Sequence, residues 1–404
     1  MQRDILFQGV AAPLRLQGAD VVLPLLPDIV VGWPFRIVEP GDTPAFFTIT
    51  ARPDAPLLRC ESHVEDRPPQ DWDPLNALCD AMAGLAVALP LSDPRLICLH
   101  AAGVEIAGRL VVFPNIRRAG KSTLSAAFAR AGHRVFSDDV VPLSFPQGGP
   151  ALGHAMGTAP RLRLPLPESL PAGFRSWAEA VPGPRNRQYH YLPIAGQPTH
   201  GETLPLGAFV LLDRRDEPVE AELIPVRADA AMDALLHQNF TRDRHSGEVL
   251  EVIAASLEAA AVWKLVYADL DGAVACLTAG FRAWAVPVEG GVERRFGPAS
   301  LDYRPGPLGR TVVQRVGVVV RWIGEVLYLA DPEGRAIQRM DALAAAIWAM
   351  LEEPGTPEEL EEALEEAFPG TPRERIAADL QALLERLWEA GLVGAGDVST
   401  VDKL

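Results

Sequence analysis

The sequence predicts an α/β protein, followed by a small C-terminal domain in which three strands precede three helices. Between residues 96 and 145, short apolar runs alternate with a helical pattern. In the same region, the order strand, loop, helix, strand surrounds the motif AGKST at residues 119–123. After a Pro/Gly-rich stretch at residues 288–311, strands come first and helices follow.

Length and charge narrow the class of protein. A chain of 404 residues with 48% hydrophobic residues can form two or three domains with cores of their own. Its formal net charge of −16 argues against binding to nucleic acids or anionic membranes, since both need clustered Lys and Arg. We therefore expect neither as a partner. The sequence leaves open whether the chain forms a homo-oligomer.

Cysteine usage and the N-terminal residues indicate a cytoplasmic protein. The four cysteines have no metal-type spacing, which indicates free thiols in a reducing compartment. The first residues lack the apolar core of a signal peptide. The apolar run at residues 81–91 is far shorter than the about 20 residues that span a membrane.

The elements of the first two predicted domains follow from periodicity and turn residues. Residues 1–72 are predicted to form a β-rich lobe of open role, with strands at 21–33, 46–51 and 56–62. Residues 73–287 are predicted to form the second domain. Its predicted strands are 96–100, 103–107, 109–113, 133–145 and 207–215, and its predicted helices are 75–89, 122–131, 230–238 and 246–261. Residues 146–205 are rich in Pro and Gly and predict an irregular surface segment.

The C-terminal domain, residues 312–404, follows a linker at residues 288–311. Its predicted strands are 311–316, 318–323 and 325–331, and its predicted helices are 342–351, 358–367 and 373–390. Between Arg339 and Gly391 there are thirteen acidic and four basic residues, a net charge of −9. This charge would repel a phosphate backbone and argues against a DNA-binding role for the domain.

The loop PNIRRAGKST at residues 114–123 has the features of a phosphate-binding loop. Such a loop offers backbone N–H groups, a helix N-terminus and a lysine to the anion, and a following hydroxyl to Mg²⁺. Gly120, Lys121 and Ser122 supply these features. Asn115 stands where the usual G-x-x-x-x-G-K-[ST] pattern has glycine, and Asn tolerates left-handed backbone angles best among the other residues. The predicted nucleotide-binding residues are Asn115, Ile116, Arg117, Arg118, Ala119, Gly120, Lys121, Ser122 and Thr123.

Acidic and histidine side chains accompany this loop at strand ends. His100 lies 21 residues before Lys121, and Asp138 and Asp139 follow Lys121 by 17 and 18 residues. Neighbouring strands would bring these groups to one edge of the sheet. Phosphoryl transfer needs positive charge and Mg²⁺ on the phosphates, and a carboxylate that accepts the proton of the attacking hydroxyl. Taken singly, the acidic pair could be a solvated strand end and the histidine a core residue.

The stretch LHAAGVEIAGRLVVFPNIRRAGKSTLSAAFARAGHRVFSDDVVPL resembles the HPr serine kinase/phosphorylase family and its kinase-like relatives. The resemblance covers residues 95–145 closely and residues 1–285 loosely. It implies the P-loop fold shared by HPr kinase and PEP carboxykinase, which has a mixed central sheet, with ATP and Mg²⁺ as cofactors. It implies that Lys121 binds phosphates, that Ser122 and Asp138 hold the metal, that Asp139 takes the proton of an acceptor serine, and that His100 supports the site.

The sequence departs from this family at two places. Asn115 replaces the leading glycine, and the family's metal-binding glutamate in an L-E-I-R-G stretch has no counterpart. The comparable residues are GTAPRLRLPLPE, a pattern found in kinase-only relatives, so we expect kinase activity without dephosphorylation. Arg161, Arg163 and Arg187 are candidates for gripping phosphates or substrate, and a solvated basic face is the alternative.

Residues 312–395 resemble PqqD-like domains, which are small winged-helix modules that bind leader peptides. The resemblance rests on three strands, then QRMDALAAAIWAMLEEPGTPEELEEALEEAF, then a third helix that ends in WEAGLV. It implies that a peptide or small protein pairs with a strand edge of this domain.

Together these patterns predict an ATP-dependent kinase that phosphorylates a hydroxyl group, a serine of a peptide or small protein, which the C-terminal domain recruits. Two alternatives remain at this stage: an inactive scaffold that binds nucleotide and peptide, and a kinase for small molecules. The sequence does not identify the substrate or the phosphate donor.

Overall fold

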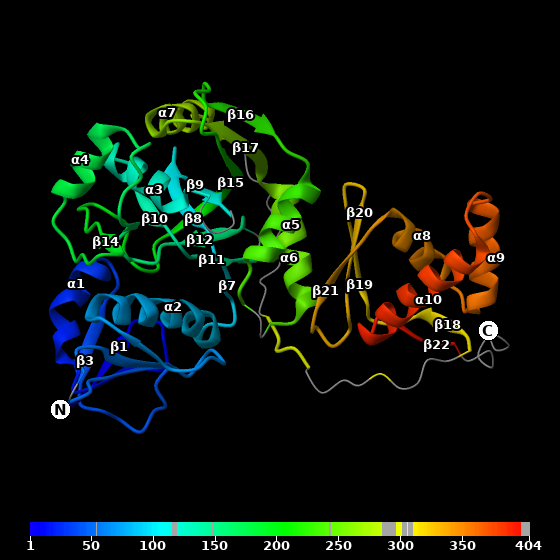
Figure 1. The fold of residues 1–404 in the computed structure, drawn as a ribbon, viewed down its shortest axis with the longest axis horizontal. Coiled ribbons are helices and arrows are strands. Elements are labelled where there is room, and N and C mark those ends of the chain that lie inside the picture. The colour runs from blue at the N-terminus through cyan, green and yellow to red at the C-terminus, as the bar shows by residue number, and fades with distance from the viewer. Residues whose placement is uncertain are drawn as a thin grey trace. The chain divides into compact units, whose positions relative to one another are not determined.

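The computed structural model describes residues 1–53, 55–114, 119–147, 149–241, 244–284, 296–300, 305 and 310–396. It divides the chain into two compact units. Unit 1 comprises Met1–Thr241 and Ser256–Arg295, and unit 2 comprises Arg242–Ala255 and Phe296–Leu404. Both units combine helices with sheets, so the predicted α/β class is confirmed (Figure 1). Most of the predicted linker, residues 288–311, lies outside the described residues, and the predicted domain boundaries stay predictions.

The N-terminal part of unit 1 is built on a six-stranded sheet of order β3-β1-β2-β4-β5-β6. Its strands are β1 (Gln2–Phe7), β2 (Leu14–Gln17), β3 (Phe35–Val38), β4 (Phe47–Thr50), β5 (Leu58–Ser62) and β6 (Gln70–Trp72). The strand predicted at residues 21–33 is wrong: this run forms the 3₁₀ helix η1 (Asp20–Leu25) and the short helix α1 (Leu26–Ile29). Pro24 and Pro27 explain the difference, because proline cannot donate to a sheet ladder, and Pro27 lies in the first turn of α1, where proline is tolerated.

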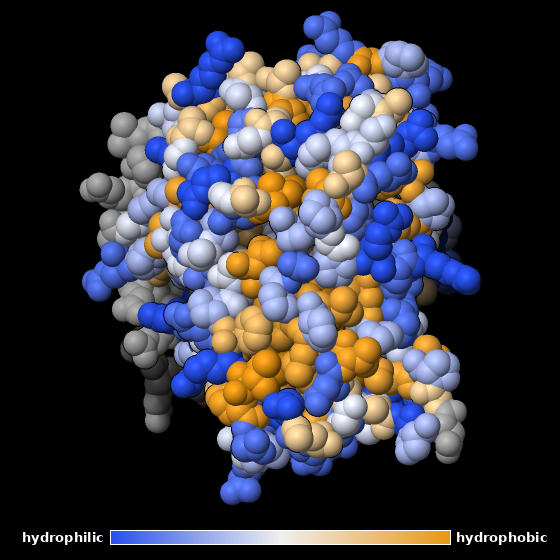
Figure 2. Space-filling model, turned by 90° about the vertical axis from the view of Figure 1, so that its left-hand side faces the viewer, coloured by the Kyte–Doolittle hydropathy of each residue, from blue (hydrophilic) through white to orange (hydrophobic). Residues whose placement is uncertain are grey.

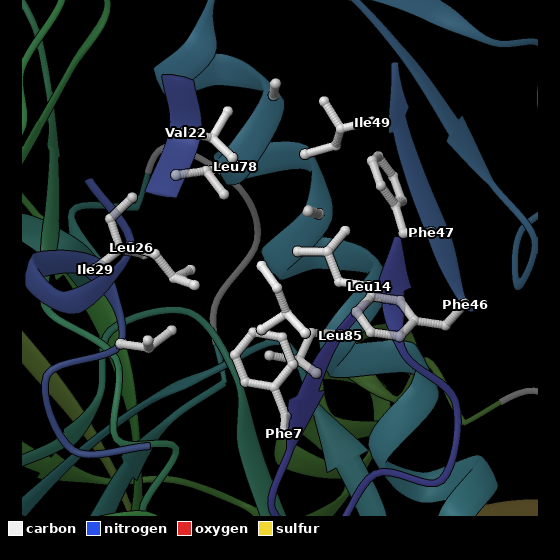
Figure 3. Packing of buried hydrophobic residues seen from close by; sticks show 14 of the residues in the cluster. Phe7, Leu14, Val22, Leu26, Ile29, Phe46, Phe47, Ile49, Leu78 and Leu85 are labelled. Atoms are coloured by element: carbon white, nitrogen blue, oxygen red, sulfur yellow. The ribbon is translucent and has the colours of Figure 1, made fainter. Parts of the chain in front are cut away.

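Helix α2 (Pro74–Ser92) covers this sheet. Its N-terminus is capped by Asp73, whose carboxylate accepts the N–H groups of Leu75 and Asn76 at 3.0 and 3.2 Å. Figure 3 shows Leu78 and Leu85 of α2 within one apolar cluster that also holds side chains of the sheet, η1 and α1. By length and composition α2 could cross a membrane, but 56% of its apolar window is buried inside the protein, as in a core helix.

The larger sheet of unit 1 has nine strands and positions the candidate site. Seven of them run in the order β10-β8-β9-β15-β12-β11-β7, and β17 and β16 extend from β15. These strands are β7 (Ile97–Leu99), β8 (Ala102–Ile106), β9 (Arg109–Phe113), β10 (Val135–Ser137), β11 (Val141–Ser144), β12 (Leu152–His154), β15 (Thr203–Arg214), β16 (Glu222–Pro225) and β17 (Ala261–Tyr267). The β9–β15 and β15–β17 pairs are parallel and the other pairs are antiparallel, so the sheet is mixed, as predicted.

Five helices and a two-stranded antiparallel sheet complete the described part of this region. The helices are α3 (Lys121–Arg130), α4 (Ala172–Ala180), α5 (Ala228–Gln238), α6 (Ser246–Ala259) and α7 (Leu270–Gly280), and the small sheet pairs β13 (Arg161–Arg163) with β14 (Tyr189–Tyr191). The segment predicted to be irregular, residues 146–205, therefore contains regular elements. The strand predicted at residues 133–145 is divided into β10 and β11 by a turn at residues 138–140. Two acidic residues in sequence favour this turn, because Asp is depleted in strands and favoured in turns.

Unit 2 contains two small sheets and three helices. The sheets are β19-β20-β21 and β18-β22, with strands β18 (Val312–Gln314), β19 (Val319–Ile323), β20 (Val326–Ala330), β21 (Ile337–Met340) and β22 (Val393–Ala395). The helices are α8 (Ala342–Met350), α9 (Pro357–Ala367) and α10 (Arg373–Glu389). The apolar face of α10 is buried against α8, α9 and β20 in one core. Asp341 caps α8, and Thr356 with Glu359 forms a capping box at α9.

Unit 2 also includes the start of α6, which is distant in sequence. The N–H and hydroxyl of Ser246 donate to the carbonyls of Gly334 and Ala336 at 2.9 and 3.0 Å. Glu251 pairs with Arg321 of β19 at 2.6 Å. The C-terminal unit is therefore completed by residues that precede the predicted linker by some forty positions.

The N-terminal part of unit 1 exposes apolar side chains. Figure 2 shows apolar surface gathered in the lower part of the view, on the side where α1 and β3 lie in Figure 1. Val21, Val31 and Ile37 are among the exposed large apolar residues in this part of the chain, at 57%, 40% and 43% exposure. Such a face is compatible with association. The oligomeric state stays open.

Candidate functional site

The N-terminus of α3 lies directly after the loop that leaves β9. Gly120 caps the helix in a left-handed conformation, with φ of +92°, which residues with a Cβ rarely adopt. Lys121 and Ser122 form the first turn, and Lys121 is 94% buried. The first N–H groups of a helix lack intrahelical acceptors and carry partial positive charge, so this end suits an anion. Of the other predicted nucleotide-binding residues, Ala119 and Thr123 are described, whereas Asn115, Ile116, Arg117 and Arg118 lie outside the described residues.

Asp138 connects the first turn of α3 to β13. Its carboxylate accepts a hydrogen bond from the Ser122 hydroxyl and another from the backbone N–H of Arg161 at 3.0 Å. The side chain is 4% exposed. Burial, together with the neighbouring charge of Asp139, raises the pKa of Asp138 to about 6, although the bonds from Arg161 and Ser122 act in the opposite direction. A buried carboxylate with a raised pKa, next to a helix N-terminus, is typical of functional sites.

Asp139 lies between a histidine and an arginine. One carboxylate oxygen is 3.3 Å from Nε2 of His100, and the other is 3.4 Å from Nη2 of Arg161. The side chain of Asp139 is 45% exposed, so a substrate can reach it. The backbone around it is fixed, because Ser137 Oγ accepts the N–H groups of Asp139 and Val140 at 3.2 and 2.9 Å.

His100 follows β7 at the same edge. Its N–H donates to the carbonyl of Gln238 at 2.8 Å, so the end of α5 fixes this backbone position. The structure therefore brings together His100, Asp138 and Asp139, which the sequence predicted at one edge, and Ser122 joins them through Asp138. The roles assigned to these residues stay predictions.

Arg161 is the predicted arginine that reaches the acidic pair. Its guanidinium carbon lies 4.7 Å from the ring centre of Tyr189 and 6.0 Å from that of Tyr191, and Nη1 contacts the sulfur of Cys79. Burial alone would lower the pKa of Arg161, but the acidic groups of Cys79, Tyr191 and the two aspartates raise it above its usual value. Arg161 therefore remains charged beside Asp139.

The other two predicted arginines lie apart from this pair. The guanidinium carbon of Arg163 is 5.9 Å from the ring centre of Tyr189, and Arg187 is exposed on the segment before β14. Cys79, Tyr189 and Tyr191 were not predicted as site residues. Cys79 comes from α2, 82 residues before Arg161, and only packing brings the two together. The alternation of Tyr189, His190 and Tyr191 is a period-2 signal that could have indicated the strand.

The oxygen groups at the start of α3 fit a magnesium ion that is shared with phosphates. Within the described residues, no group of three or more His, Cys, Asp or Glu side chains could hold a metal ion. Mg²⁺ in nucleotide sites commonly uses only one or two protein carboxylates, with waters and phosphate oxygens as further ligands. Asp138 and the Ser122 hydroxyl, already hydrogen-bonded to each other, match that donor set.

Comparison with known proteins finds similarities for both parts of the chain. Residues 327–393 match the family model of coenzyme PQQ synthesis protein D (PqqD), so unit 2 contains a PqqD domain. The chain is also similar to the solved structure of the Hpr(Ser) kinase/phosphatase from Coxiella burnetii, with 15% identity and a TM-score of 0.20, over 45% of this chain and 93% of that chain. No curated protein matches the chain. The PqqD match confirms the resemblance of the C-terminal residues to that family.

Proposed function

We propose that the protein is a phosphotransferase that uses MgATP to phosphorylate a hydroxyl group, a serine of a peptide or small protein, in the cytoplasm. The observation that carries this proposal is the cluster at the start of α3: Ser122 bonded to buried Asp138, with Asp139 beside His100. A helix N-terminus, a lysine, a magnesium-type donor pair and a reachable carboxylate are what phosphoryl transfer requires.

The residues act on the two reacting groups in distinct ways. Lys121 and the N–H groups of the first turn bind the phosphates. Asp139 accepts the proton of the acceptor hydroxyl as its oxygen bonds to phosphorus, and His100 orients that carboxylate through the 3.3 Å contact. Asp138 and Ser122 would hold the magnesium ion, which would neutralise phosphate charge. MgATP, when bound, supplies the phosphoryl group, and ADP is the leaving group.

The PqqD domain supports a peptide as the substrate. β21 is an outer strand of the sheet β19-β20-β21, so its backbone can pair with an extended peptide. The opposite outer strand, β19, lies against the start of α6, where Arg321 pairs with Glu251. We therefore propose β21 as the edge to which the peptide adds, in the winged-helix arrangement that the sequence indicates.

One observation favours a second candidate, a scaffold that binds nucleotide without transfer. Arg161 lies 3.4 Å from Asp139, and its charge competes with a metal ion or a proton for that carboxylate. The absence of the family's second metal-binding carboxylate points in the same direction. A catalytic site requires that Arg161 turn toward the phosphates when these are bound.

Binding and transfer measured on the same variants separate these candidates. In calorimetry with MgATP, we expect Lys121→Ala to weaken binding by roughly 10- to 100-fold, because one charge-assisted contact is lost. Asp139→Asn should keep that affinity and lose about 10²- to 10⁴-fold in transfer to a serine peptide encoded beside this gene.

Each alternative has its own outcome in this experiment. Wild-type binding without transfer to any peptide or small molecule would favour the scaffold. Transfer to a small hydroxyl compound but to no peptide would indicate a small-molecule kinase. If neither the wild type nor Lys121→Ala binds MgATP, the proposal is contradicted.

A further inference from the structure

Tyr267 carries a buried hydroxyl for which the described residues supply no hydrogen-bond partner. It is the last residue of β17 and is 1% exposed. Its phenol oxygen has no donor or acceptor around it among these residues. An orphaned buried hydroxyl destabilises the folded protein, so such groups call for an explanation.

The sheet topology brings this phenol to the phosphate-binding end of α3. β17 is parallel to β15, and β15 is parallel to β9, so these strands end at the same edge of the sheet. Tyr267 belongs to the apolar layer that also contains Leu124 of α3. A Cβ built on Gly120, the N-cap of α3, would lie 3.0 Å from the Tyr267 oxygen. The hydroxyl is therefore aimed at the start of α3.

The chemistry of this place identifies the missing partner. Burial raises the pKa of Tyr267 to about 12, so the phenol is neutral and can donate at physiological pH. The start of a helix presents N–H donors, which cannot accept a bond from the hydroxyl. The described residues give this hydroxyl no acceptor, so its acceptor has to come from outside the chain, and an anionic oxygen held by the N–H groups of the first turn of α3 fits best.

We propose that Tyr267 donates a hydrogen bond to a phosphate oxygen of the polyphosphate chain bound at the N-terminus of α3, an inference that rests on the proposed function. Gly120 then has a second reason to be glycine, because a side chain there would displace the hydroxyl from this position. Tyr267 thus binds the polyphosphate from the side of the sheet.

The test uses the full-length protein and two probes, MgATP and magnesium tripolyphosphate, in calorimetry. Tyr267→Phe removes only the hydroxyl and should weaken binding of both probes by about 10-fold or more. The matched control is Tyr328→Phe, which removes a buried hydroxyl from β20 of unit 2 and should leave both affinities unchanged. Without ligand, Tyr267→Phe should unfold at the temperature of the wild type or above it, because no bond is lost.

The outcomes distinguish this inference from the proposed function. Unchanged affinity of Tyr267→Phe for both probes, with tight wild-type binding, overturns the inference alone. Weaker binding of MgATP only would assign the hydroxyl to another part of the nucleotide and overturn the phosphate contact. A lower unfolding temperature of ligand-free Tyr267→Phe would show that the hydroxyl has a partner in the free protein. Failure of wild type to bind either probe overturns the proposed function, and the inference with it.

Discussion

Burial of the ionised Asp138 carboxylate at the site lowers the stability of the folded protein. The carboxylate is buried next to a second acid, and its pKa is raised from 3.8 to about 6. An acid with a raised pKa in the folded state binds its proton more tightly there than in the unfolded chain. Stability is therefore lost as the pH rises from about 4 to about 6, by about 3 kcal/mol for a shift of this size. Such costs are common where a charge serves ligand binding.

Asp138→Asn should remove this pH dependence. In urea unfolding with a chelator present, the variant should gain stability relative to wild type between pH 4.5 and pH 8, by up to about 3 kcal/mol. The groups that act on Asp138 are Asp139, Arg161 and Ser122, and all remain in the variant.

Asp331→Asn is the control, a substitution of a second buried aspartate. Asp331 is 1% exposed and accepts the N–H groups of Arg335 and Ala336 while pairing with the Arg335 guanidinium at 3.1 Å. Its loss should lower stability at pH 8 by on the order of 2 kcal/mol. If the free energy of unfolding changed with pH in the same way in Asp138→Asn and in the wild type, this would contradict the claim that the buried Asp138 charge causes the pH dependence.

Single residues were predictable where they follow a strand or a motif. His100, Asp138 and Asp139 were expected at one edge from their positions after apolar runs, and the structure brings them together. Tyr267 and Cys79 were not, because each reaches the site through packing between segments that lie far apart in the sequence. Propensity and spacing report local structure and carry no information on such contacts.

Among the elements, the start of α3 depends most on one backbone conformation. Gly120 has φ of +92°, and an added Cβ would meet the Tyr267 hydroxyl at 3.0 Å. Gly120→Ala should therefore cost about 1–2 kcal/mol in backbone strain and, in addition, displace the phenol from the phosphate site. Thermal unfolding and MgATP calorimetry measure the two effects.

Gly132→Ala at the other end of α3 provides the control. Gly132 has φ of +87°, but an added Cβ there meets nothing within 4 Å. This variant should suffer similar backbone strain and retain its affinity for MgATP. Equal nucleotide affinity in the two variants would mean that the start of α3 does not bind the nucleotide.

Elements were predictable where periodicity and caps agree. The apolar runs before the loop and the helix after it form as expected as β7, β8, β9 and α3. The run at residues 21–33 was misassigned, because its apolar composition favours a strand while its prolines favour helical turns. β17, a run of apolar and aromatic residues, was not predicted, and Tyr267 at its end was missed with it.

At the scale of the molecule, the two units are interleaved along the chain. Residues 242–255 belong to unit 2 but lie between segments of unit 1. A fragment that starts at residue 312 would lose the hydrogen bonds of Ser246 and the Glu251–Arg321 pair. Recruitment of a peptide by the PqqD domain is therefore best tested on the full chain, by changing the peptide and leaving the protein intact.

A serine peptide with its leader segment should react with a higher kcat/KM than the same peptide without it. Binding of the leader to unit 2 makes the encounter with the α3 site intramolecular, and such tethering can raise apparent affinity by on the order of 10²-fold or more. KM should change by this factor while kcat at saturation stays constant, because the reacting groups are the same.

Since residues 339–391 carry a net charge of −9, a basic leader should also bind more weakly as salt increases. A scrambled leader of the same composition controls for charge, and the leader added as a separate peptide should inhibit instead of rescue. Equal kcat/KM with and without the leader would show that the PqqD domain does not deliver the substrate to the kinase site.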